Sequence, residues 1–144
     1  MTQNKQLSRE EFPTFVEMPT RWMDNDAYGH MNNIVHYALI DTAVTDWQRN
    51  CGFFSEEHKC LEFMVVESGC CYFSEAAYPD KIAVGLRIKK IGRTSWIYQA
   101  GLFRERDELC FALGFFAQVL VDCKKRRPTP IPKKMREALK LIEM

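Results

Sequence analysis

The chain has 144 residues, 47% of them hydrophobic and 27% charged, and its formal net charge at pH 7 is +1. This composition excludes an intrinsically disordered chain, and the length suits one domain with one hydrophobic core. The near-neutral charge predicts neither nucleic acid nor an anionic membrane as a partner, and no segment has the roughly 18 apolar residues of a membrane-spanning helix.

The N-terminal part of the chain predicts a flexible segment and then an irregular strand. Residues 1–9 are polar and have no periodic apolar face, so we expect them to be flexible and to precede a single domain of residues 10–144. Residues 12–23 mix apolar side chains with polar ones and with two prolines, Pro13 and Pro19. Such a pattern is typical of a strand with irregular edges.

A long helix is predicted to begin at Asn32 or Asn33, where the apolar spacing changes to the helical period. Asparagine is a good N-cap and Gly52 suits the C-terminal end, so the helix has about 18 residues. It is apolar over much of its circumference, which predicts burial against a sheet. The residues expected to share its buried face are Ile34, Tyr37, Ala38, Asp41, Val44 and Thr45.

Four runs rich in β-branched and aromatic residues follow a polar, irregular loop after the helix. They span residues 63–73, 81–91, 94–104 and 109–122, and turn signals separate them. The short links predict antiparallel neighbours that are joined as hairpins. A proline-rich segment then leads to a short terminal helix within residues 133–144.

The order of these elements predicts an α+β fold. One long central helix is expected to be wrapped by a curved five-stranded antiparallel sheet. Part of the sheet would stay exposed, so we also expect self-association.

The cysteines carry information about the cellular compartment. None forms a C-x-x-C pair, and the N-terminal sequence MTQNKQLSREE has no apolar signal-peptide core. We therefore interpret them as reduced thiols of a cytoplasmic protein. The six cysteines are Cys51, Cys60, Cys70, Cys71, Cys110 and Cys123.

The segment from Arg21 to Tyr37, RWMDNDAYGHMNNIVHY, places two acids, a Gly-His pair and an Asn pair between the strand and the helix. The first amides of a helix lack backbone partners and carry the positive end of its dipole, so a polarised carbonyl can bind there. Asp26 lies at the far end of the same loop, and such a carboxylate suits acyl-group hydrolysis as nucleophile or as general base for water. The alternative is that Asp24 and Asp26 only hold the loop through hydrogen bonds to nearby amides.

Three neighbouring residues also have expected roles. His30 either orients substrate or polarises water, or it only packs the loop; with Asp26 it makes a poor metal site. Gly29 is expected to supply a backbone angle that other residues avoid. Tyr37 is expected to pack in the core rather than to act as a catalytic phenol.

The run DNDAYGHMNN from Asp24 to Asn33, followed by Tyr37, resembles the 4-hydroxybenzoyl-CoA thioesterase family of the hotdog fold. The resemblance implies that Asp26 is the catalytic carboxylate and that the backbone amide of Asn33 polarises the thioester carbonyl. The Gly-His-Met-Asn-Asn segment is more similar to thioesterases that act on fatty-acyl chains than to the hydroxybenzoyl-specific members.

The resemblance also implies an assembly, either a homodimer with one continuous sheet or a homotetramer, with active sites at the subunit interface. Glu67 and Ser68 would then face Asp26 of the partner subunit. Coenzyme A carries phosphates, so Arg93 and the basic run at residues 124–127 are candidate ligands, unless they are merely solvated charges.

Together the residues and the resemblance predict an acyl-CoA thioesterase that releases a free acid and CoA. Asp26, Asn33 and His30 are the expected catalytic residues, and no metal or redox cofactor is expected. Two alternatives stay open: a non-catalytic protein that binds acyl thioesters, and a hotdog hydratase or dehydratase, although the chain lacks the D-x-N-P-x-H segment of those enzymes. The expected substrate-binding residues are Gly29, Asn32, Tyr37, Glu67, Ser68 and Arg93.

Overall fold

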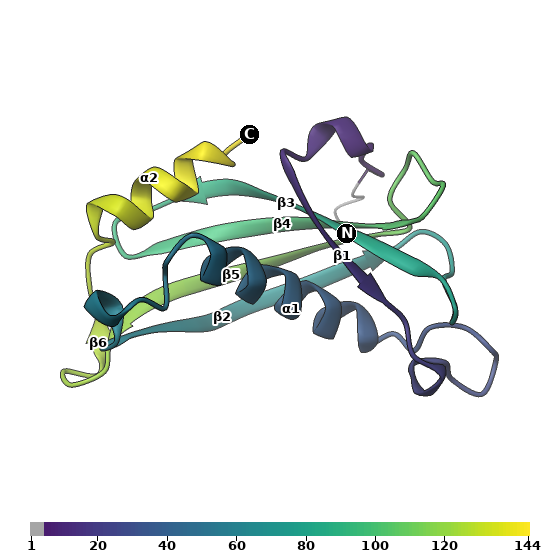
Figure 1. Ribbon diagram of the computed structural model, residues 1–144, viewed down its shortest axis with the longest axis horizontal. Helices are drawn as coiled ribbons and strands as arrows, with labels where there is room; N and C mark the ends of the chain where they lie inside the picture. Colours follow the sequence, from purple (N-terminus) through teal and green to yellow (C-terminus); the bar gives the residue numbers. More distant parts are fainter. Residues whose placement is uncertain (1–4) are drawn as a thin grey trace.

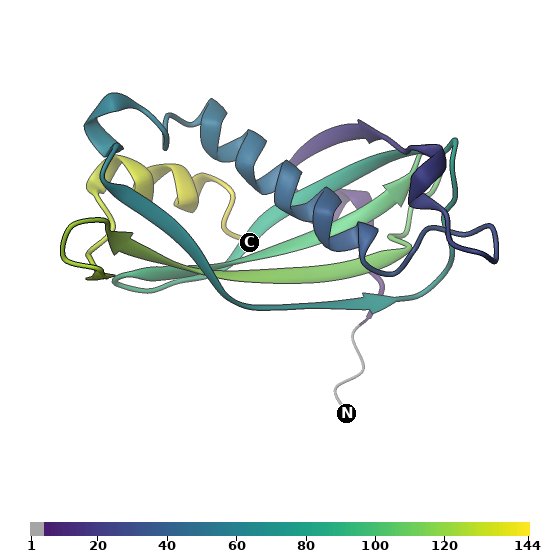
Figure 2. The same ribbon diagram turned by 90° about the horizontal axis from the view of Figure 1, so that it is seen from below.

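A single antiparallel sheet curls around helix α1, and helix α2 packs beside strand β3 (Figures 1 and 2). The computed structural model describes residues 5–144. Neighbouring strands follow the order β1-β3-β4-β5-β2, and β6 pairs with the end of β5. The strands are β1 (Thr14–Pro19), β2 (Leu61–Tyr72), β3 (Lys81–Ile91), β4 (Ser95–Arg104), β5 (Ala112–Asp122) and β6 (Arg127–Pro128). The helices are α1 (Val35–Asn50) and α2 (Lys133–Leu141).

The predicted architecture is confirmed, since five long strands form one curved antiparallel sheet around a long helix (Figure 2). The predicted flexible segment of residues 1–9 lies partly outside the described residues, and its described part contacts the domain. There Leu7 is buried, and Arg9 Nε donates to the Asp107 carbonyl over 2.6 Å. No helix in the described part of the chain is long and apolar enough to cross a membrane.

The connection between β2 and β3 is a crossover, not the predicted hairpin. β2 pairs with β5, whereas β3 pairs with β1 and β4. The link of residues 73–80 is long enough to cross the end of the sheet, so its length did not require a hairpin (Figure 1). It contacts the loop before α1, where the Met31 amide donates to the Ala76 carbonyl over 2.7 Å.

Helix α1 buries a different face from the predicted one. Ile34 precedes the helix and is 65% exposed, and Ala38 faces solvent. The helix is apolar over much of its circumference, so spacing alone allowed more than one buried face. Packing against the sheet selects one face. Gly114 of β5 has no side chain, so Ile40 packs directly over it, and a Cβ at Gly114 would lie only 2.6 Å from Ile40 Cδ1. The buried side chains are His36, Leu39, Ile40, Ala43, Val44, Trp47 and Gln48.

Three buried polar side chains form a network beneath the C-terminal part of α1. Gln48 Nε2 donates to the Tyr98 hydroxyl over 2.9 Å and to Gln118 Oε1 over 2.8 Å. The ring of Trp47 packs against Tyr98, with ring centroids 5.9 Å apart. The network therefore satisfies polar groups within an otherwise apolar core.

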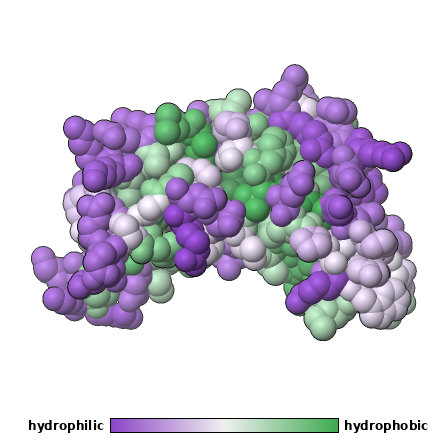
Figure 3. Space-filling model, in the orientation of Figure 1, coloured by the Kyte–Doolittle hydropathy of each residue, from purple (hydrophilic) through white to green (hydrophobic). Residues whose placement is uncertain are grey.

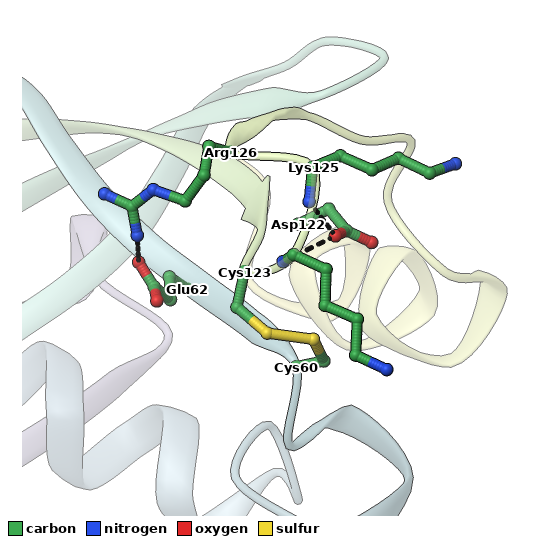
Figure 4. Close-up of a disulfide and its surroundings, with 7 residues drawn as sticks. Cys60, Glu62, Asp122, Cys123, Lys125 and Arg126 are labelled. Carbon is green, nitrogen blue, oxygen red and sulfur yellow. Dashed lines mark hydrogen bonds and ion pairs between the residues drawn. A yellow bond between two sulfur atoms is a disulfide. The ribbon is translucent and has the colours of Figure 1, made fainter.

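Cys60 and Cys123 form a disulfide, so the prediction that every cysteine is reduced is wrong. The pairing of β2 with β5 brings these residues together, with their Cα atoms 5.2 Å apart, although 63 positions separate them in the sequence. Figure 4 shows the adjoining turn, in which Asp122 Oδ1 accepts the amides of Lys124 and Lys125. The cytoplasmic location rested partly on reduced thiols, so it stays a prediction.

Candidate active site

Asp24 anchors the loop that connects β1 to α1. Its side chain is buried and accepts hydrogen bonds from the Arg21 amide over 2.7 Å and from the Arg21 guanidinium over 2.8 and 3.1 Å. Burial raises the pKa of Asp24, but these hydrogen bonds and the Arg21 charge outweigh it, so the pKa lies below its ordinary value. The Asp24 carbonyl accepts the Asn32 amide over 2.8 Å, so Asp24 holds the loop at both ends.

One carboxylate oxygen of Asp26 holds the same loop and the other is free. Oδ1 accepts the Tyr28 amide over 2.8 Å and, more weakly, the His30 amide over 3.4 Å. The Asp26 amide donates to the His30 carbonyl over 2.8 Å, and Gly29 turns the chain between them with a φ of 79°, as predicted. Within residues 5–144, Oδ2 accepts no hydrogen bond, so it is available to water or to a substrate.

The turn before α1 leaves one amide without a partner. The helix begins at Val35 with Ile34 as its N-cap, so the predicted start at Asn32 or Asn33 is wrong. Asn32 instead holds the preceding turn, because its Oδ1 accepts the Ile34 amide over 3.1 Å and its carbonyl accepts the Val35 amide over 2.9 Å. The Asn33 amide donates to no group in the described part of the chain. The Tyr72 hydroxyl donates to the Asn33 carbonyl over 2.7 Å and so fixes this residue against the end of β2.

Asp26 and Asn33 line one pocket with a volume of about 570 Å³. Its opposite wall comes from the end of β2 and from the β2–β3 crossover. His30 Nε2 lies 3.0 Å from Glu75 Oε2, which ties the crossover to the Asp26 loop. The pocket therefore brings Asp26 and Asn33, the residue two positions before α1, to one space. The lining residues are Asp26, Tyr28, His30, Met31, Asn33, His36, Tyr72, Ser74, Glu75 and Ala76.

Sequence reasoning missed the crossover residues and His36. The crossover was interpreted as a hairpin link, so Glu75 and Ala76 had no expected place near Asp26. His36 was not among the predicted site residues. Among the described residues, no group of three or more His, Cys, Asp and Glu residues is arranged to hold a metal ion. The correct helix face would have identified His36, because it lies on the buried side of the first turn.

Six predicted residues lie outside this pocket, and two of them, Gly29 and Asn32, belong to the loop before α1 without lining the pocket. Tyr37 packs against the core, in line with the interpretation as a core residue. Glu67 and Ser68 are exposed on the edge strand β2, so an assembly is needed to place them at an active site. Arg93 lies in the β3–β4 turn, at the opposite end of the sheet from the Asp26 loop (Figure 1).

Comparisons with known proteins agree with the fold. Residues 20–139 match the family model described as the thioesterase-like superfamily. The PA5185 protein from Pseudomonas aeruginosa is 37% identical over 96% of this chain and 97% of its own, with a TM-score of 0.91. The PA2801 protein from Pseudomonas aeruginosa, described as a putative thioesterase, is 25% identical over 94% of this chain and 99% of its own, with a TM-score of 0.80.

A third structure shares the fold at lower identity. It is a DHNA-CoA thioesterase from Staphylococcus aureus, 19% identical over 90% of this chain and 89% of its own, with a TM-score of 0.79. None of the curated proteins matches this chain at a significant level.

Proposed function

This chain belongs to the thioesterase-like superfamily and has its hotdog fold, and we propose that it is an acyl-CoA thioesterase that releases a free acid and CoA. One observation carries the proposal: Asp26 and Asn33 line the same pocket, and Asp26 Oδ2 and the Asn33 amide have no hydrogen-bond partner among residues 5–144. The match covers the superfamily as a whole, so membership of the narrower 4-hydroxybenzoyl-CoA family stays a prediction.

Hydrolysis of a thioester needs an attacking oxygen and a donor for the carbonyl oxygen. Asp26 Oδ2 supplies the first, either by attacking the thioester carbon or by taking a proton from an attacking water. The Asn33 amide, two residues before the positive end of α1, donates to the carbonyl oxygen as negative charge develops there. The sulfur of CoA leaves with a proton, and water supplies the oxygen of the free acid. His30, Gly29 and Asn32 hold the loop, and no metal or redox cofactor takes part.

We propose a homodimer or homotetramer as the working assembly. β2 is an edge strand, and its side chains Met64, Val65 and Val66 are 44%, 44% and 64% exposed. Apolar strand edges pair readily with another strand, and Figure 3 shows apolar surface between the polar ends of the molecule. Such pairing would cover Glu67 on the same strand. Arg93 would reach CoA phosphates only across a subunit interface.

The Asp26→Asn substitution tests the catalytic assignment. Asparagine keeps an oxygen for the Tyr28 amide but cannot attack or take a proton, so thiol release from an acyl-CoA panel should fall about 100-fold or more. The melting temperature should stay near that of the wild type because the loop hydrogen bond remains. Asp46→Asn, an exposed acid on α1, is the matched control and should keep full turnover.

Three results would contradict the proposal. Undiminished turnover in pure Asp26→Asn protein would remove Asp26 from the chemistry. Binding of acyl-CoA by the wild type without thiol release from any member of the panel would identify a non-catalytic binder. Conversion of 3-hydroxyacyl-CoA to an enoyl product without free CoA would identify a hydratase.

A further inference from the structure

The pocket is also lined by a tyrosine to which the proposed mechanism gives no part. Tyr72 is the last residue of the edge strand β2. Its hydroxyl donates to the Asn33 carbonyl over 2.7 Å, although 39 positions separate the two residues in the sequence. This hydrogen bond therefore joins the sheet to the residue that carries the proposed oxyanion donor.

The ring of Tyr72 is held by the core on one side. It packs edge-on against His36, with ring centroids 4.6 Å apart at 85°. His36 is buried and packs in turn against Phe111, with centroids 5.9 Å apart. Partial burial raises the pKa of the Tyr72 phenol, so the hydroxyl keeps its proton near neutral pH and stays a donor. Tyr72 thus brings a donor of fixed position to the Asn33 carbonyl.

Two hydrogen bonds hold the peptide groups on either side of the Asn33 Cα. The Asn32 carbonyl accepts the Val35 amide over 2.9 Å. The peptide bond between Asn32 and Asn33 is trans, so its N–H points opposite to its C=O and therefore away from Val35. Tyr72 holds the next peptide group through the Asn33 carbonyl. Together the two bonds set the direction in which the unpaired Asn33 amide points.

We propose that Tyr72 is a positioning residue that holds the Asn33 amide in the orientation needed to stabilise the oxyanion, an inference that rests on the proposed thioesterase activity. A donor stabilises developing charge best when its orientation is fixed before the reaction. The hydrogen bond from Tyr72 is open to solvent, so water would replace a missing hydroxyl at the Asn33 carbonyl. The turn would then stay folded, but its amide would be held less firmly. Tyr72 acts through Asn33 and needs no contact with the substrate.

The Tyr72→Phe substitution keeps the ring against His36 and removes only the hydroxyl. Loss of a whole oxyanion donor lowers kcat by about 100-fold or more, so a loosened donor should lower it by about 10-fold. We measure thiol release from butanoyl-CoA, decanoyl-CoA and benzoyl-CoA. KM should stay within about 2-fold of the wild type, because the amide interaction strengthens chiefly in the transition state. The melting temperature should fall by about 5 °C at most.

Tyr78→Phe is the matched control. Tyr78 lies in the β2–β3 crossover and is 42% exposed, compared with 45% for Tyr72. It does not line the pocket, so removal of its hydroxyl should leave kcat unchanged. An equal fall of kcat in Tyr78→Phe, or an unchanged kcat in Tyr72→Phe, would overturn the role of Tyr72.

A measurement without substrate separates this inference from the proposed function. The NMR resonance of the Asn33 carbonyl carbon depends on the hydrogen bond that this carbonyl accepts. It should move in Tyr72→Phe and stay in place in Tyr78→Phe, and an unmoved resonance in Tyr72→Phe would overturn the positioning contact. Absence of thiol release by the wild type would overturn the thioesterase, and with it the catalytic part of the inference, even where the resonance shows the contact.

Discussion

Replacing Gln48 by leucine tests whether the buried polar network stabilises the fold. Gln48 Nε2 donates to the Tyr98 hydroxyl and to Gln118 Oε1, which lie in side chains that are 0% and 4% exposed. Leucine has a similar size but no donor, so both acceptors would lose a partner without gaining access to water. Each such loss costs about 1–3 kcal/mol, so the free energy of unfolding should fall by roughly 2–6 kcal/mol.

The assay is denaturant unfolding followed by circular dichroism. The midpoint should fall with an unchanged slope, because the surface exposed on unfolding stays the same. For a chain of this length, each kcal/mol corresponds to about 2–4 °C in melting temperature. Thr42→Leu, on the exposed face of α1, is the control and should stay within about 0.5 kcal/mol of the wild type.

A combined variant separates hydrogen bonding from packing. Gln48→Leu with Tyr98→Phe and Gln118→Leu removes all three polar groups, so no buried acceptor is left without a partner. This protein should recover much of the stability lost in Gln48→Leu. The reasoning is refuted if Gln48→Leu is as stable as the wild type, or if the combined variant is less stable than the single one.

Two further predictions concern the disulfide and the loop acid. Breaking the Cys60–Cys123 disulfide opens a loop closed over 63 residues, so the Cys60→Ser/Cys123→Ser protein should lose about 4 kcal/mol in guanidinium titrations. Reductant should have the same effect on the wild type, with Cys51→Ser as a neutral control, and an unmoved midpoint would count against the disulfide. Despite its burial, Asp24 has a pKa lowered by Arg21, so its stabilisation is complete above the unfolded-state pKa of about 3.9 and is lost as pH falls through the folded-state pKa. The stability gap between the wild type and Asp24→Asn should therefore narrow from about pH 5 to about pH 2, and a gap that does not change with pH would contradict this account.

The sequence was sufficient for the local elements but not for their pairing. Residues 81–91 were predicted as a strand and form β3. A run of β-branched and apolar residues between two turn signals is typical of a strand. The partner of β2 was not predictable in the same way. Residues 73–80 suit either a hairpin or a crossover, and the choice depends on how the whole sheet encloses α1. The disulfide was missed for the same reason, since Cys60 meets Cys123 only when β2 pairs with β5.

The buried face of α1 shows a second limit of reasoning from spacing. Apolar residues occur around much of the helix, so the period alone does not say which side meets the sheet. The buried face is set by packing at Gly114, which has no side chain and so lets Ile40 approach β5 closely. His36 lies one turn before Ile40 on the same buried face of α1. Because the buried face was predicted wrongly, His36 was not expected at the site.

The two acids of the loop were distinguished first by a resemblance, and the structure gives a physical reason for the same distinction. Asp24 is buried and its carboxylate is occupied by Arg21, so a substrate would have to displace a charged partner to reach it. Asp26 uses one oxygen to hold the turn and leaves the other free beside the pocket. A carboxylate can both hold a loop and act in catalysis when one of its oxygens accepts the loop hydrogen bonds and the other stays free. The structural and the catalytic interpretations of Asp26 are therefore compatible, and Asp26→Asn separates them because it preserves the first role and removes the second.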